Sequence, residues 1–224
     1  MNTISIKTNS GGEATITENQ FEEFQSNFRG SVFHAGTHGY NQAREIWNGM
    51  FDKKPALVAR CVGTSDVIHA VNFGRENDLE VSVKGGGHNS AGTAVTDGGL
   101  MIDLSLMRRV TVDRKNQTAR VDGGCLLGDV DYETQLNGLA VSAGIVSHTG
   151  VGGLALGGGF GWISRKHGLS VDNMISAEVV TADGRVVTAS ATENEDLFWG
   201  TRPKEKNSSG RSRKKQKPWG SMSV

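Results

Sequence analysis

Two clusters of glycine constrain this chain more than any other feature. Eighteen of the 31 glycines lie between positions 85 and 161. They are densest in Gly85-Gly86-Gly87, which His88 follows, and in the run GVGGLALGGGFG at 150–161. Glycine loses more conformational entropy on ordering than any other residue. Two stretches of bare backbone therefore indicate places where N–H groups must approach a bulky anion such as a pyrophosphate.

A βαβ pattern leads into the first cluster. The apolar run PALVARCV at 55–62 predicts a strand, and LEVSVK at 79–84 predicts a second one. Between them GTSDVIHAVNFGREND predicts a helix, with Thr64 or Ser65 as its N-cap. Strands joined by such a crossover run parallel. The glycine-histidine loop then leaves the carboxyl end of a strand, where open α/β sheets bind ligands.

Hairpins and further helices complete the pattern. RRVTVD and TARVDGG predict one hairpin, and ISAEVVTADGRVVTASA predicts another around Asp183-Gly184. GGLMIDLS is a further apolar run, and CLLGDVDYETQLNGLA predicts a helix. Hairpins beside one βαβ unit indicate an α+β fold.

Two helices are also predicted before the first strand. Phe21, Phe24 and Phe28 share one face of the first helix. The second helix has four side chains in helical register and Gly49 as its stop; they are Tyr40, Ala43, Ile46 and Trp47.

Composition indicates a soluble, cytoplasmic chain. At 224 residues it is long enough for one domain with appendages. No apolar run approaches the ~20 residues of a membrane helix, and the polar start lacks a secretory signal. The isolated Cys61 and Cys125 predict small buried hydrophobic residues, without a disulfide framework. His34 and His38 lack a third ligand nearby, so no metal site is predicted.

A dinucleotide fold of the parallel α/β type is the nearest competitor. Gly150, Gly152 and Ala155 satisfy G-x-G-x-x-A. The residues that follow are interrupted by glycine at 157–159 and 161, which makes an ordinary helix unfavourable. The next predicted strand closes a hairpin instead of continuing a βαβ unit. The context therefore disfavours that fold.

Three segments carry a resemblance to a known family. SVKGGGHNSAG, GIVSHTGVGGLALGGGFGWISRKHGLSVDN and AEVVTADGRVVTASATENEDLFWG resemble the FAD-binding domain of the p-cresol methylhydroxylase/vanillyl-alcohol oxidase superfamily. The most similar subgroup is the berberine-bridge-enzyme-like oxidases. The resemblance covers about residues 36–200 and implies two small α+β subdomains with FAD stretched between them. It leaves 1–35 as a polar segment with a short helix and 201–224 as a basic tail.

The resemblance implies the cofactor-binding residues. In the first loop they are Lys84, Gly85, Gly86, Gly87, His88, Asn89 and Ser90. In the second cluster and beyond they are Gly144, Ser147, Thr149, Gly150, Gly152, Gly153, Gly157, Gly161, Asn173 and Val179. Core packing is predicted for Phe160 and Trp162.

The family attaches FAD covalently through the histidine that matches His88, to the 8α-methyl carbon of the flavin. Some members form a second bond through a cysteine, and that position holds Val146 here. A second bond is therefore not expected. His148, two residues on, is assigned an ordinary polar role.

The chain departs from the family after ENEDLFWG. A glycine-rich continuation into a large substrate-binding domain is expected there, whereas residues 201–224 carry eight basic residues and one acidic residue without periodicity. Because it is polar and basic, this tail is expected to be disordered. Its abrupt change in composition is typical of a frameshift product or an alternative gene end. The body carries a net charge of −7 and no nucleic-acid footprint.

The functional hypotheses differ in what such a chain can do. The resemblance implies an oxidoreductase whose flavin takes a hydride from an alcohol or sugar-like substrate. The family's usual base is a tyrosine beyond the departure point, and neither Tyr40 nor Tyr132 matches it. No catalytic residue is therefore assigned, and a flavin-binding fragment without turnover is the alternative. An interaction protein that uses its basic tail is the second alternative. Uncovered apolar surface at the flavin edge would favour self-association.

Overall fold

The computed structural model describes residues 3–202, which form two compact units. The first unit contains residues 3–107 and 180–186, and the second contains residues 108–179 and 187–202. The tail predicted to be disordered lies, from residue 203 onward, outside the described residues. The boundaries predicted at residues 35 and 200 stay a prediction.

A four-stranded sheet organises the first unit, in the order β3-β4-β6-β5. Its strands are β3 (Ser31–His34), β4 (Leu57–Arg60), β5 (Val81–Lys84) and β6 (Leu100–Asp103). β6 pairs in parallel with both β4 and β5, and β3 joins β4 antiparallel. All four residues of β6 are buried. Its first three residues are apolar in succession, which is typical of a strand covered on both faces.

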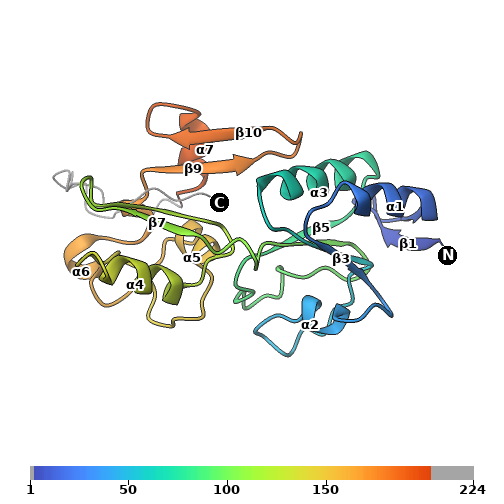
Figure 1. Cartoon of the computed structure of the whole chain (residues 1–224), viewed down its shortest axis with the longest axis horizontal. Helices are drawn as coiled ribbons and strands as arrows, with labels where there is room; N and C mark the ends of the chain where they lie inside the picture. The colour runs from blue at the N-terminus through green and yellow to red at the C-terminus, as the bar shows by residue number, and fades with distance from the viewer. Residues whose placement is uncertain (1–2, 203–224) are drawn as a thin grey trace. The chain divides into compact units, whose positions relative to one another are not determined.

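Helices and a small hairpin cover this sheet. They are β1 (Ile4–Lys7), β2 (Glu13–Ile16), α1 (Glu18–Ser26), α2 (Tyr40–Arg44) and α3 (Thr64–Glu76). α1 lies beside α3 (Figure 1), and the rings of Phe24 and Phe73 stack there with their centroids 4.2 Å apart. Among the described residues no helix is long and apolar enough to cross a membrane.

The predicted βαβ unit is confirmed, and β6 lies between its two strands in the sheet. β4 and β5 are both parallel to β6, which lies between them. The N-cap of α3 is Gly63, so the prediction of Thr64 or Ser65 was wrong. Asp66 supports this end of the helix instead, because its buried carboxylate accepts the backbone N–H groups of Val62 and Arg29 at 2.9 and 3.0 Å.

Two features of the N-terminal half differ from the prediction. The β1-β2 hairpin and β3 were not expected, because strands of four residues leave little periodicity to detect. α2 ends at Arg44, before Ile46 and Trp47, although helical register was predicted to continue through them. Tertiary contacts of the segment after α2 overrode that local pattern.

The second unit combines hairpins and short helices. Its elements are β7 (Val110–Asp113), β8 (Thr118–Val121), α4 (Leu127–Gln135), α5 (Val151–Leu156), α6 (Ser164–His167), the 3₁₀ helix η1 (Val171–Asn173), β9 (Ser176–Val180), β10 (Val186–Ser190) and α7 (Glu195–Gly200). β9 and β10 extend at their connected ends into the first unit. Both predicted hairpins are present, β7 with β8 and β9 with β10. Gly184 has φ +79° in the second turn, a conformation that glycine adopts readily.

The helix after Gly150 rules out the parallel dinucleotide fold. α5 has six residues and ends at Gly157. β9, the next strand, forms a two-stranded sheet with β10 instead of joining a parallel sheet. The mixed α+β class predicted from the sequence is confirmed.

Candidate cofactor site

The first glycine loop begins where β5 ends and packs on the segment after α2. Gly87 has φ +71°, and a Cβ there would lie 3.5 Å from the backbone of Ile46. The N–H of Trp47 donates to the carbonyl of Gly87 at 3.1 Å. The loop is therefore held by backbone contacts from residues that sequence analysis assigned to a helix.

A buried charge cluster lies at the base of this loop. The carboxylate of Asp103 is fully buried and accepts a hydrogen bond from Arg60 Nε at 2.8 Å. Lys84 Nζ lies 3.5 Å from the same carboxylate and donates to the carbonyl of Ala43 at 2.8 Å. Burial holds the pKa of Lys84 below its usual 10.5. The ammonium of Lys84 therefore faces the protein, although the sequence placed this residue against the cofactor.

His88 is half-buried, and an indole covers one face of its imidazole. The rings of Trp47 and His88 are 4.9 Å apart with an interplanar angle of 9°. Beyond them the Asn48 side chain donates to the carbonyl of Ser90 at 3.0 Å. Asn89 organises the loop itself, because its Oδ1 accepts the N–H groups of Ala91 and Thr93 at 3.0 and 3.2 Å.

Two further residues of the same segment hold the end of the loop. Gly92 has φ +68°, and a Cβ there would fall 2.4 Å from the ring of Phe51. Lys53 Nζ donates to the carbonyls of Gly92 and Val95, both at 3.1 Å. Sequence analysis missed these contacts, because residues forty positions apart leave no local signal of their pairing.

The second glycine cluster belongs to the second unit and is held by the start of α4. The N–H groups of Leu127 and Gly128 donate to the carbonyls of Thr149 and Ser147 at 2.9 and 2.7 Å. The N–H of Val151 donates back to the carbonyl of Cys125 at 2.8 Å. The backbone on both sides of Gly150 is therefore fixed by a neighbouring helix.

Some glycines of the cluster are required by packing. A Cβ on Gly161 would lie 1.7 Å from the carbonyl oxygen of Ala143. One on Gly144 would lie 2.5 Å from Leu154 Cδ1. Because the atom that Gly161 meets belongs to the backbone, this residue must be glycine whether or not a ligand binds, whereas at Gly144 the Leu154 side chain would have to move. Gly157 is tighter than usual, with its Cβ position 3.2 Å from the carbonyl of Gly153.

Gly153 has no such packing reason. It is exposed within α5, and nothing lies within 4 Å of its Cβ position. Glycine inside a helix costs roughly 1 kcal/mol relative to alanine. The fold does not require glycine at this position, and the backbone there is open. A bulky ligand could therefore approach the backbone at Gly153 closely.

Asn173 and Val179, two more of the predicted residues, pack within the second unit. Asn173 is buried, and its amide donates to the carbonyls of Leu169 and His167 at 2.7 and 3.0 Å. Val179 packs half-buried against the core cluster of Val171 and Phe198. Gly152 is buried within α5, whereas the side chain of Ser147 is exposed.

The prediction of core packing for two aromatic residues was wrong. Phe160 is 76% exposed and Trp162 is 85% exposed. Both follow a run of glycines in which Gly158 and Gly159 have positive φ, and that backbone turns the segment outward. Apolar surface is thus uncovered directly beside the second glycine cluster.

Neither tyrosine offers a base in an open site. The Tyr40 hydroxyl is buried and donates to the carbonyl of Pro55 at 2.7 Å, and burial raises its pKa above 10.0. Tyr132 is exposed on α4. Within the described part of the chain, no three His, Cys, Asp or Glu side chains gather as a metal site would require.

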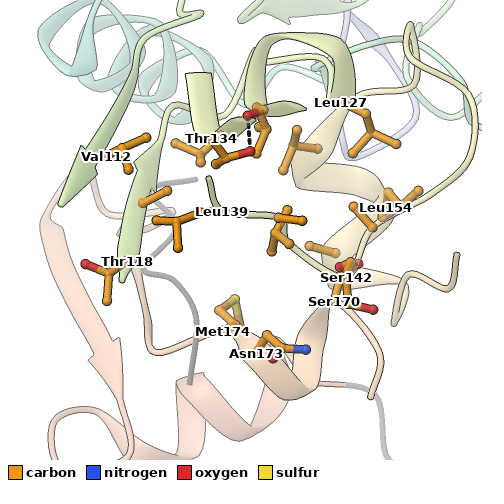
Figure 2. Close-up of a pocket in the computed structure, with 18 residues that line it drawn as sticks. Val112, Thr118, Leu127, Thr134, Leu139, Ser142, Leu154, Ser170, Asn173 and Met174 are labelled. Atoms are coloured by element: carbon orange, nitrogen blue, oxygen red, sulfur yellow. Dashed lines mark hydrogen bonds between the residues drawn. The ribbon is translucent and has the colours of Figure 1, made fainter. Parts of the chain in front are cut away.

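An apolar cavity of about 50 Å³ lies inside the second unit. Figure 2 shows Val112, Leu127, Leu139, Leu154 and Met174 on its wall. Two of the labelled polar groups are already engaged with protein atoms: Thr134 donates to the carbonyl of Val130 at 2.8 Å, and Ser170 donates to that of Ser142 at 2.7 Å. No charged side chain lines it. The cavity therefore offers no charged group to neutralise a phosphate and no ionisable group to transfer a proton.

Comparison with protein families places these loops in context. Residues 55–190 match a family model described as an FAD binding domain. The chain is 40% identical over 174 residues to (R)-6-hydroxynicotine oxidase of Paenarthrobacter nicotinovorans, which covers 78% of this chain and 38% of that protein. It thus spans about two fifths of that relative's length.

Solved structures agree with the fold. The crystal structure of 6-hydroxy-D-nicotine oxidase from Arthrobacter nicotinovorans matches with a TM-score of 0.76 and 39% identity, over 78% of this chain and 39% of that one. Glucooligosaccharide oxidase from Acremonium strictum matches with a TM-score of 0.73 and 38% identity, over 77% and 37%. The latter structure is described as carrying a 6-S-cysteinyl, 8α-N1-histidyl FAD.

Proposed function

Because this chain belongs to the FAD binding domain family, within the berberine-bridge-enzyme-like FAD-linked oxidoreductases, we propose that it forms the FAD-binding part of an oxidoreductase. The flavin accepts a hydride from an alcohol or sugar-like substrate and is held covalently by His88. The observation that carries the proposal is His88 itself. It follows a glycine loop at the carboxyl end of β5, inside the matched region, with one face of its ring covered and its side chain half-buried.

Each unit by itself offers a glycine loop that can contact a phosphate of FAD. Backbone N–H groups bind phosphate oxygens only where side chains leave room for the approach. Gly153 provides such an open place in the second unit, and residues 85–87 provide the bare backbone in the first. Lys84 supports its loop from inside, since its ammonium binds the carbonyl of Ala43.

His88 supplies a nitrogen nucleophile for attachment to the 8α carbon. A neutral imidazole nitrogen carries the lone pair that forms the C–N bond. One C–H bond of the methyl group and the imidazole N–H bond break in the same overall reaction. The two protons and two electrons released pass to dioxygen, which becomes hydrogen peroxide. When bound, FAD supplies the hydride acceptor for the oxidation of substrate.

One bond to the protein is expected, in contrast with the two described for the glucooligosaccharide oxidase. Val146 occupies the position that the resemblance assigns to the second attachment. The two cysteines of the chain are buried at other places, Cys61 beyond β4 and Cys125 before α4. Neither belongs to the segment around Val146.

The chain is much shorter than the oxidases that it resembles. It covers 37–39% of the length of the oxidases compared above, and neither tyrosine stands in an open site as a base. A flavin-binding part without turnover is therefore the alternative. Oxygen consumption with a panel of alcohols, sugars and oligosaccharides separates the two, since only a complete oxidase consumes oxygen in a substrate-dependent way.

His88→Ala tests the covalent bond. Purified wild-type protein is expected to be yellow, and its flavin should stay with the protein after acid precipitation. The variant should release all of its flavin into the supernatant. His148→Ala is the matched control, because His148 lies exposed near the second glycine cluster and should keep the acid-stable bond. Acid-stable flavin in His88→Ala would contradict the assignment of His88, and folded wild-type protein that takes up no FAD would refute the function.

A further inference from the structure

Trp47 stacks on His88 although most of its side chain is exposed to solvent. Trp47 is 64% exposed, so core burial does not place it. Its plane lies only 9° from that of the imidazole at 4.9 Å between centroids. A near-parallel pair of rings at an exposed position needs another reason for its geometry.

Backbone contacts on both sides of His88 provide that reason. The N–H of Trp47 donates to the carbonyl of Gly87, and the side chain of the next residue, Asn48, donates to the carbonyl of Ser90. These contacts join residues 47–48 to positions directly before and two after His88. α2 ends three residues earlier, at Arg44, which frees this segment to lie along the loop.

A stacked indole limits the rotation of the imidazole. The terminal torsion of a histidine side chain has broad minima, so an unsupported ring samples many orientations. With one face covered, the ring keeps its edge nitrogens in a restricted plane. Restricting a reacting group to a productive orientation accelerates bond formation.

We propose that Trp47 is a positioning residue for His88, and that its indole orients the imidazole for the bond to the flavin. This inference rests on the covalent attachment proposed above. Trp47 itself takes no part in bond making, so it acts only through the orientation of His88. The aromatic face is what matters, and phenylalanine should replace it in part whereas leucine should not.

The test compares Trp47→Leu and Trp47→Phe in the full chain, produced under riboflavin limitation and then mixed with FAD. Trp47→Leu should accumulate acid-stable flavin about tenfold more slowly than wild type, and Trp47→Phe should stay within about threefold. Trp199→Leu is the matched control, because Trp199 is similarly exposed, at 59%, but lies on α7.

A second measurement does not depend on the flavin. In flavin-free protein the His88 ring protons, assigned by comparison with His88→Ala, should show an upfield NMR shift from the indole ring current. The shift should vanish in Trp47→Leu and persist in Trp47→Phe. Equal melting temperatures of the three proteins would show that the fold is unchanged.

The outcomes separate this inference from the proposed function. Wild-type attachment that Trp47→Leu does not slow, or a ring shift that Trp47→Leu does not change, would overturn the positioning role alone. Wild-type protein that binds FAD without an acid-stable bond would overturn the covalent attachment, and the positioning role with it. If Trp47→Phe restores the melting temperature of an unstable Trp47→Leu but not its rate of attachment, an aromatic face is not what positions His88, and the inference is wrong.

Discussion

The ammonium of Lys84 lies 3.5 Å from the carboxylate of Asp103, which is completely buried. The two residues face each other in register on β5 and β6, and Arg60 on the neighbouring β4 completes the cluster. Buried charges require partners, because an unpaired one is costly to desolvate. This cluster lies directly before the glycine loop and links the sheet to the carbonyl of Ala43 at the end of α2.

Lys84→Met should destabilise the protein by about 3 kcal/mol, because it leaves Asp103 with fewer partners in a buried place. Lys7→Met is the control, since Lys7 pairs with Glu80 at 2.6 Å on the surface. An exposed pair contributes at most about 1 kcal/mol. Urea unfolding followed by circular dichroism measures both. Equal losses in the two variants would show that burial does not strengthen the cluster.

Lys84 should also make the free energy of unfolding depend on pH in a defined direction. Burial lowers the pKa of Lys84 in the folded state, so the unfolded chain binds its proton more tightly. The free energy of unfolding should therefore rise with pH between this lowered pKa and 10.5. Lys84→Met lacks this contribution. The difference in stability between wild type and variant should widen over that interval, and a constant difference would contradict the lowered pKa.

Alanine at two glycines of the second cluster should act in opposite directions. Gly161→Ala places a Cβ 1.7 Å from the carbonyl of Ala143 and should lower the melting temperature strongly or prevent folding. Gly153→Ala meets no neighbour and should raise the free energy of unfolding by roughly 0.5–1 kcal/mol. Thermal unfolding of flavin-free protein measures both.

Titration with FAD then tests whether the backbone at Gly153 contacts the cofactor. Gly153→Ala is expected to bind FAD more weakly despite its greater stability, because the added methyl occupies open backbone. Unchanged affinity would remove Gly153 from the cofactor site while leaving the stability prediction intact.

Asp129 should make the second unit sensitive to acid. Partial burial raises the pKa of this carboxyl, but hydrogen bonds from Arg108 Nε and the N–H of Leu126, both at 2.8 Å, outweigh burial and hold the pKa below 3.8. A lowered folded pKa contributes stability that is present above the unfolded pKa and is lost as the pH falls through the folded value.

Asp129→Asn should therefore lose about 1–2 kcal/mol at pH 7 and little below the folded pKa. Because α4 holds the carbonyls of Ser147 and Thr149, hydrogen exchange in residues 147–151 should also accelerate. A stability loss that persists undiminished at low pH would mean that the charge of Asp129 is not its cause.

The two thiols should be unreactive in the folded protein. Burial raises the pKa of Cys125 to about 12 and that of Cys61 further. At pH 8 a thiol with such a pKa is ionised in only about one molecule in 10⁴, and the thiolate is the reacting form. A thiol reagent should label neither cysteine until denaturant is added. Rapid labelling of the native protein would show that one of them is accessible.

Much of this protein could be predicted from local sequence. The βαβ pattern of β4, α3 and β5, both later hairpins and the glycine-histidine loop at the end of β5 follow from periodicity and turn chemistry. These signals are carried by neighbouring residues, so a single sequence contains them. The family and its FAD cofactor were implied by the resemblance of three glycine-containing segments to that family.

The tertiary structure alone decided how the residues of the loops are used. The sequence could not show that Lys84 turns inward to Asp103, that Trp47 leaves its predicted helix to cover His88, or that Phe160 lies in solvent. Nor could it separate Gly161, which packing requires, from Gly153, which packing leaves free. Each of these depends on atoms brought together from distant positions in the chain, and local periodicity records only which face of an element is apolar, not what that face meets.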